Sequence, residues 1–181
     1  MTNTDALVGR VKERARSGSA ALPPPVGEAE LEAAESALGF RLPPLLADLY
    51  RRIANGGFGP EYHFLPLVGE GETAVAAYLD QRAETDEPCW PEGVLPILEW
   101  GCAMYAAVDC TSESSTVLLF EPNAFDGDWA EVWFVDAENL AGWLETWMAG
   151  TGWYEPDGGE EIELSLWAAA RARLEPAAEN R

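Results

Sequence analysis

Basic residues are scarce in this 181-residue chain. It has 11 Lys and Arg residues against 32 Asp and Glu residues, which gives a formal net charge of −21. Between Ala54 and Ala170 the only basic residue is Arg82, opposed by 23 carboxylates. A surface this negative repels DNA, RNA and anionic membranes, so we expect binding to neither nucleic acid nor a membrane. Two explanations of the charge stay open, which are solubility alone and attraction of a basic protein partner.

Residues used in catalysis and metal binding are also few. His63 is the only histidine, so the chain has no second imidazole for a metal cluster or a proton relay. It lies in a predicted strand between aromatic residues, where we interpret it as an ordinary strand residue. A nucleophile set could be assembled from Cys102, His63 and Asp109, but no basic neighbour lowers the pKa of the thiol. The sequence therefore predicts no enzyme, no catalytic residue, no cofactor and no metal.

Long apolar runs and paired cysteines are missing as well. No segment approaches 18 uncharged apolar residues, and the N-terminus has no apolar signal-peptide core. Cys89, Cys102 and Cys110 are an odd number at no metal-like spacing, which is typical of free thiols in a reducing cytosol. We therefore expect a cytoplasmic protein. Its length indicates about one domain.

The N-terminal region differs in charge from the rest. Residues 4–16 form a basic helix candidate whose weak apolar face consists of Leu7, Val8, Val11 and Ala15. A proline-rich linker follows and reaches residue 27. We divide the chain into residues 1–27 (arm and linker), 28–150 (main domain) and 151–181 (a C-terminal loop and helix extension). We expect the arm to be tethered and solvated, and the alternative is that it folds back onto the acidic body.

Hydrophobic periodicity predicts an α+β fold, with an antiparallel sheet packed against helices. Pro96 places the first clear strand at an edge or a strand start, and the two strands after it form a hairpin with a longer connection. Asp136 is the expected N-cap of a helix whose apolar stripe, from Leu140 to Met148, packs on the sheet. The predicted helices cover residues 28–38, 40–55, 73–83, 136–150 and 162–174. The predicted strands cover residues 62–67, 94–98, 104–108, 116–120 and 130–135.

Three segments in this order resemble the SUKH superfamily. They are LPPLLADLYRRIANGGFG (42–59), LPILEWGCAMYAAVD (95–109) with VLLFE (117–121), and LAGWLETWMAG (140–150). The resemblance covers roughly residues 28–150. It implies a single SUKH-like domain. Many members carry Gly-Asp where this chain has Gly101-Cys102, so a role for that acidic position is not carried over.

For bacterial members the resemblance implies a toxin-immunity role, in which a non-enzymatic domain binds and blocks a cognate toxin, often a nuclease. The carboxylates favour the same role, because a nuclease presents a basic cleft that an acidic surface can fill. The expected partner is therefore a basic protein. A regulatory or scaffold module without a toxin is the alternative, as the eukaryotic members suggest. An uncharacterised hydrolase is a third hypothesis, and it requires a pocket of carboxylates with shifted pKa values.

The loop from Pro122 to Trp129 is the best candidate for partner contact. It combines turn-forming residues with two aromatic rings and two aspartates, and such rings surrounded by charge are typical of protein-binding surfaces. The alternative is that Phe125 and Trp129 simply close the core. The predicted partner-binding residues are Phe125, Asp126, Asp128 and Trp129, with Glu61 and Glu121 nearby if the strands pair as expected.

Overall fold

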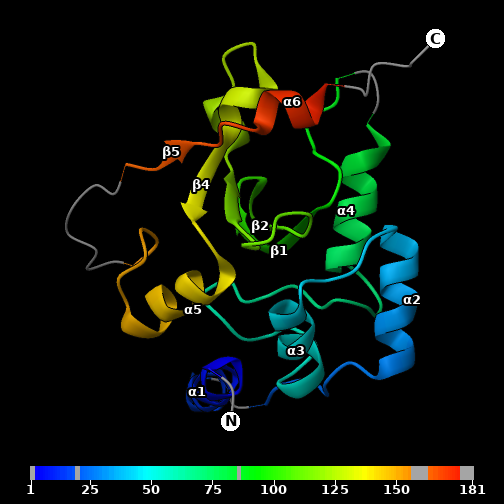
Figure 1. Cartoon of the computed structure of the whole chain (residues 1–181), viewed down its shortest axis with the longest axis vertical. Coiled ribbons are helices and arrows are strands. Elements are labelled where there is room, and N and C mark those ends of the chain that lie inside the picture. Colours follow the sequence, from blue (N-terminus) through cyan, green and yellow to red (C-terminus); the bar gives the residue numbers. More distant parts are fainter. Residues whose placement is uncertain (1–2, 19–20, 85–86, 156–162, 176–181) are drawn as a thin grey trace.

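A five-stranded antiparallel sheet forms the centre of the computed structural model, which describes residues 3–18, 21–84, 87–155 and 163–175 (Figure 1). The strands lie side by side in sequence order, so strands that are neighbours in the chain are also neighbours in the sheet. They are β1 (Val94–Gly101), β2 (Met104–Asp109), β3 (Val117–Phe120), β4 (Trp133–Ala137) and β5 (Ser165–Leu166). The predicted α+β class and the central hairpin of β2 and β3 are confirmed.

Helices surround this sheet, and local sequence signals account for their ends. Thr73 Oγ1 accepts a hydrogen bond from Ala76 N (3.0 Å) at the start of one helix, as an N-cap should. The helices are α1 (Asn3–Gly18), α2 (Glu28–Leu38), α3 (Pro44–Arg52), α4 (Ala74–Ala83), α5 (Leu140–Ala149) and α6 (Ala170–Leu174), with 3₁₀ turns η1 (Pro122–Ala124) and η2 (Trp129–Val132). Within the residues described here, none of these helices has both the length and the apolar character that crossing a membrane requires.

Large aromatic rings are prominent in the core, among the aliphatic side chains of the strands and helices. Every residue of β3 is buried, so its side chains are covered on both faces instead of alternating with solvent. Trp90 packs edge-on against Trp133 (ring centroids 4.8 Å apart) and against Phe120 (5.1 Å). Burial of each such ring stabilises the fold by roughly 2–3 kcal/mol. The stripe of α5 also joins this core, as predicted.

The N-terminal helix is not a solvated arm, and that expectation is wrong. Leu7, Val8, Val11 and Ala15 are all buried, and α1 packs against α3 and α5 (Figure 1). The weak apolar face is therefore enough to hold the helix, because α3 and α5 present matching apolar surface. Arg10 also forms an ion pair with Glu145 of α5.

The segment 62–67 is not a strand, and His63 is not a strand residue. The chain turns at His63, which has a φ of 62°, and returns to the sheet where Leu65 N donates to Ile97 O of β1 (2.8 Å). The turn residues after α3 cause this path. A Cβ at Gly56, which has a φ of 77°, would lie 2.7 Å from the Leu65 backbone, so only glycine permits this close approach. The aromatic pattern of the segment reflects packing and not sheet pairing.

Several other boundaries differ from the prediction. The helix expected over 40–55 covers only Pro44–Arg52. Asp136 lies within β4, and Asn139 is the N-cap of α5, because Asn139 Oδ1 accepts from Gly142 N (2.8 Å). The strand expected over 130–135 begins only at Trp133, after the η2 turn. The helix expected over 162–174 is instead the short strand β5, a turn and α6, while Ile162 lies outside the described residues.

Candidate partner-binding face

Two connections between strands lie at the same end of the sheet. Gly101 of β1 pairs with Met104 of β2, so the β1–β2 turn closes this end, and Phe120 of β3 pairs with Trp133 of β4, so the β3–β4 connection begins there too. Asn123 Nδ2 donates to Cys102 O (3.2 Å) and thereby joins the two connections. The loop 121–129 thus lies beside the β1–β2 turn.

Internal hydrogen bonds hold the loop 121–129 in shape. Glu121 Oε1 accepts from Asn123 N (2.9 Å) and Asn123 Nδ2 (2.7 Å), which stabilises the η1 turn. Asp128 Oδ1 accepts from Ala130 N (2.9 Å) at the start of η2. Glu121 and Asp128, both predicted to bind a partner, therefore also stabilise the turns of the loop. A partner that docks here meets a loop that is already ordered.

The two aromatic residues of this loop have different environments. The ring of Trp129 is half-buried between Phe125 (centroids 4.2 Å apart) and Phe120 (6.4 Å). Phe125 itself is 41% exposed. Trp129 therefore closes the core, as the alternative interpretation proposed, while Phe125 remains available for contact.

The predicted carboxylates are also not equivalent. Asp128 forms an ion pair with Arg171 of α6, and its pKa is lowered first by the backbone hydrogen bond from Ala130 and then by that guanidinium. Asp126 and Glu61 are exposed. Glu61 precedes Tyr62, which packs on Trp100 at the end of β1, so Glu61 is near the β1–β2 turn although the expected strand pairing is wrong.

The sequence interpretation missed Tyr62 and the β1–β2 turn, which lie beside the predicted binding residues. Tyr62 is 58% exposed and packs edge-on against Trp100 (centroids 6.1 Å apart), at the end of β1. Gly101, Cys102 and Ala103 follow with φ values of 85°, 52° and 61°, so three successive residues occupy the left-handed region. Gly101 is the one signal of this turn in the sequence, but a single glycine before an apolar run also fits the entry to a strand.

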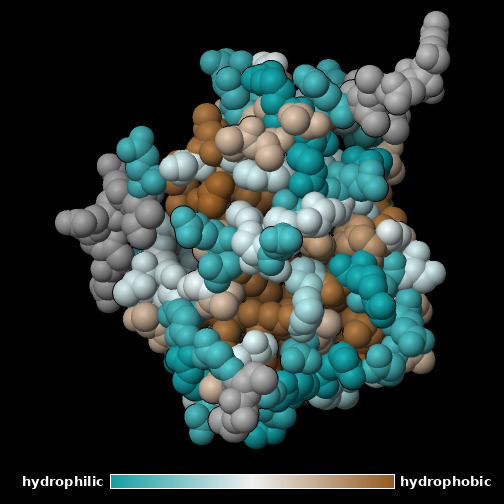
Figure 2. Space-filling model, in the orientation of Figure 1, coloured by the Kyte–Doolittle hydropathy of each residue, from teal (hydrophilic) through white to brown (hydrophobic). Residues whose placement is uncertain are grey.

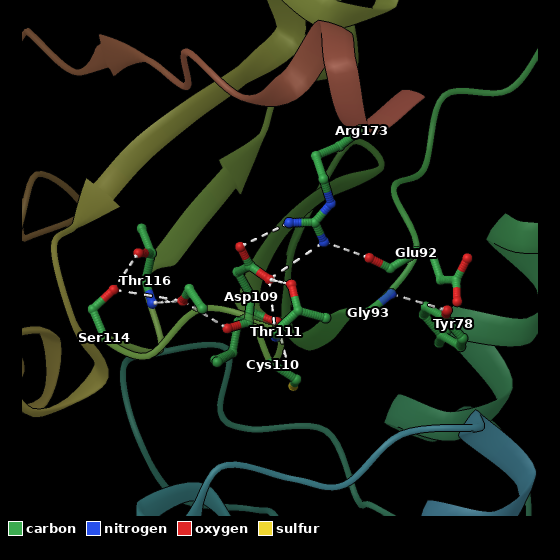
Figure 3. A network of polar contacts seen from close by, with 11 residues as sticks. Tyr78, Glu92, Gly93, Asp109, Cys110, Thr111, Ser114, Thr116 and Arg173 are labelled. Carbon is green, nitrogen blue, oxygen red and sulfur yellow. Dashed lines mark hydrogen bonds and ion pairs between the residues drawn. The ribbon is translucent and has the colours of Figure 1, made fainter. Parts of the chain in front are cut away.

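A polar network at the opposite end of β2 has a structural role (Figure 3). Asp109 is buried, and its carboxylate accepts hydrogen bonds from Arg173 Nη1 of α6 (3.1 Å) and Thr111 Oγ1 (2.7 Å). Arg173 Nη2 also donates to Glu92 O (2.5 Å). Both carboxylate oxygens of Asp109 are thus engaged, and the network fastens α6 to the sheet. We call it the Asp109–Arg173 lock.

The same geometry separates the residues of the hypothetical nucleophile set. Cys102 precedes β2 and Asp109 ends it, so the two side chains lie at opposite ends of a six-residue strand. Burial raises the pKa of a second thiol, Cys110, to about 12, which leaves it protonated at neutral pH. Among the residues that the structure describes, no group of three or more His, Cys, Asp or Glu is placed to hold a metal ion.

Charge is unevenly distributed over the molecule. Helices α1 and α3 carry six of the eleven basic residues, and several of these form ion pairs with other helices, for example Arg51 with Glu28 of α2 (2.7 Å) and Arg52 with Asp5 of α1 (2.9 Å). The segment from residue 83 to residue 170, which contains the strands and the loops between them, has no Lys or Arg of its own. Figure 2 shows polar side chains over most of one view, with hydrophobic ones visible where Figure 1 places β4 and near the middle.

Comparison with known proteins agrees with this fold. The model of the SMI1 / KNR4 family (SUKH-1) matches residues 25–146. The chain belongs to this SUKH-1 family. The match contains α2, α3, α4 and the strands β1 to β4, whereas α1, β5 and α6 lie outside it. No curated protein matches the chain.

Proposed function

We propose that this SUKH-1 protein is a non-enzymatic, cytoplasmic immunity protein that binds and blocks a basic toxin domain, with a nuclease as the favoured class. Family membership supports a partner-binding module. The observation that carries the proposal is the contrast in charge, because Arg82 alone opposes 23 carboxylates between Ala54 and Ala170. Such a surface steers a basic protein toward it and competes with phosphate for a nuclease cleft.

The site for this contact is the loop 121–129 together with Glu61. Phe125 supplies exposed apolar area, and Asp126 and Glu61 supply exposed charge. Glu121, Asp128 and Trp129 hold the loop in place by capping, ion pairing and stacking. In this arrangement a rigid support presents a few contact residues, which lowers the entropic cost of binding.

Co-expression with candidate toxin domains, beginning with any that a neighbouring open reading frame encodes, tests the proposal. We expect a complex that survives purification at about 50 mM salt and weakens strongly near about 500 mM, because salt screens exposed charges. Toxin activity should disappear in the complex. A complex with unchanged affinity over this salt range would remove the electrostatic part of the proposal, and an active toxin within the complex would remove the inhibitory part.

The scaffold alternative depends on the N-terminal arm. Because α1 is docked in the structure, deletion of the arm is not a clean test of this alternative. Deletion of residues 1–25 would expose the apolar surfaces of α3 and α5 that α1 covers, so it would disturb folding as well as assembly. Substitution of exposed Arg16 by Gln should leave α1 docked, because it changes none of the four buried residues of α1. A scaffold that uses the basic helix should lose its partner in this variant, whereas an immunity protein should keep its affinity.

The hydrolase hypothesis receives no support from the one carboxylate whose pKa is raised among the described residues. Burial raises the pKa of Asp136 above its usual range. Its Oδ2, however, already accepts a hydrogen bond from Trp143 Nε1 (2.9 Å) of α5. This carboxylate joins α5 to β4, which is a structural position and not that of a general base facing a substrate.

A further inference from the structure

We propose that Tyr62 and Phe125 are paired aromatic anchors on either side of the β1–β2 turn, and that together they bind an arginine-bearing segment of the partner. The inference rests on the proposed function and specifies the surface that performs it. Tyr62 was not among the residues predicted from the sequence. The surface, which we call the turn face, consists of residues 60–63, 100–104 and 121–126.

The exposed rings are the first reason. Among the described residues, the large hydrophobic side chains that are strongly exposed are Tyr62 (58%), Leu166 (53%), Leu79 (44%) and Phe125 (41%). Both aromatic members of this set border the β1–β2 turn, since Tyr62 packs on Trp100 just before it and Asn123, two residues from Phe125, bonds to Cys102 O within it. Rings that are fixed at the base and exposed at the tip are typical anchors of protein interfaces.

The backbone of the turn face is the second reason. Four non-glycine residues in the described part have positive φ, and three of them, His63, Cys102 and Ala103, belong to this face. Such conformations cost free energy and persist where surrounding contacts enforce them, which often marks a functional surface. Cys102 and Ala103 are exposed, so the strained turn lies between the rings and in reach of a partner.

The negative charge of the turn face indicates which kind of partner side chain it binds. Glu61 and Asp126 are exposed on this face. Of the basic residues around this face, Arg171 already pairs with Asp128, and Arg14, which lines a hollow with Gly59 and His63, lies over the ring of Trp147. A guanidinium can stack on an aromatic ring and pair with a carboxylate at the same time, which an ammonium does less well. The turn face therefore fits arginine side chains of a basic segment.

Substitutions that leave the net charge unchanged distinguish binding through the rings of the turn face from general electrostatic attraction. The probe is a fluorescein-labelled nona-arginine peptide, and its affinity is measured by fluorescence anisotropy in about 150 mM NaCl. The test variants are Tyr62→Ala and Phe125→Ala, and the matched controls are Leu79→Ala and Leu166→Ala, which remove similarly exposed apolar side chains elsewhere. All four variants keep the net charge, so differences in affinity report ring contacts. Circular dichroism verifies that each variant is folded.

We expect each ring variant to bind roughly two- to fivefold more weakly, and both controls to bind as the wild type does. Amide NMR shifts in the wild type should concentrate at residues 60–63, 100–104 and 121–126. Equal affinity of all four variants, or shifts spread over α4 and the turn face alike, overturns the inference. If the toxin still co-purifies in the experiment above, the proposed function survives that result. If the wild type binds neither peptide nor toxin, both fail.

Discussion

At the scale of single residues, Asp136 shows how the fold alters a side chain. It stands in β4 under α5, where desolvation raises its pKa by penalising the charged form and the Trp143 indole offsets part of that penalty. Its neighbour Glu138 is exposed. Sequence alone cannot tell which of these two carboxylates is buried, because burial depends on the position of α5.

Replacement of Asp136 by Asn should therefore raise stability at neutral pH. The folded-state pKa is above the unfolded value, so the folded protein binds the proton more tightly, and the free energy of unfolding falls as pH rises through that interval. The asparagine side chain keeps an oxygen acceptor and never ionises. Urea unfolding of both proteins at several pH values should show an advantage of the variant that grows from acidic to neutral pH. Glu138→Gln is the control, and an equal pH-dependent gain there would contradict the explanation.

Ala103 offers a second test at this scale. Its φ of 61° is unfavourable for any side chain with a Cβ, and glycine relieves that strain. We expect Ala103→Gly to increase the free energy of unfolding by roughly 0.5–1 kcal/mol. Ala76→Gly in α4 is the matched control and should reduce it by about 1 kcal/mol, because glycine is a poor helix former. Denaturant curves that show losses of similar size in both variants would remove strain at the turn as an explanation.

At the scale of elements, the helices and the central hairpin were predictable, whereas the chain ends were not. Thr73 and the glycines after α2 and α5 are local signals, and each is found at the expected helix end. The position of α1 depends on apolar surface from α3 and α5, which are distant in sequence. The α6 segment depends likewise on Asp109, 64 residues before Arg173.

The Asp109–Arg173 lock makes α6 part of the fold, although it lies outside the family match. Removal of Arg173 leaves a buried carboxylate without its cation, so we expect Arg173→Ala to lower the free energy of unfolding by about 3 kcal/mol. Arg171→Ala breaks an exposed ion pair on the same helix and should cost less than about 1 kcal/mol. Chemical denaturation of the two variants measures this difference. Equal losses would show that α6 is held by its apolar contacts and not by the lock.

At the scale of the whole molecule, the net charge of −21 acts on stability as well as on binding. Carboxylates of the sheet region repel one another, and the compact state increases that repulsion. The ion pairs of α1 and α3 are exposed to solvent, so they offset little of it. The folded protein should therefore be under electrostatic stress at low ionic strength.

Salt should accordingly stabilise this protein. We expect the free energy of unfolding to rise as NaCl increases from about 10 to about 500 mM, because screening weakens repulsion over the Debye length. A variant with Glu70, Glu113 and Glu138 changed to Gln, all three of which are exposed, should show a smaller rise. Thermal unfolding at each salt concentration provides the measurement. A fall in stability with salt would indicate that attractive ion pairs dominate instead.

The sequence by itself determined the fold class, the family resemblance, the acidic character and the loop from Pro122 to Trp129, because these follow from local propensity, motif order and composition. Tertiary structure alone decided that α1 docks, that Asp128 pairs with Arg171, and that Tyr62 stands exposed beside the β1–β2 turn. The physical reason is that these features depend on contacts between residues far apart in the chain, and no local pattern encodes such contacts.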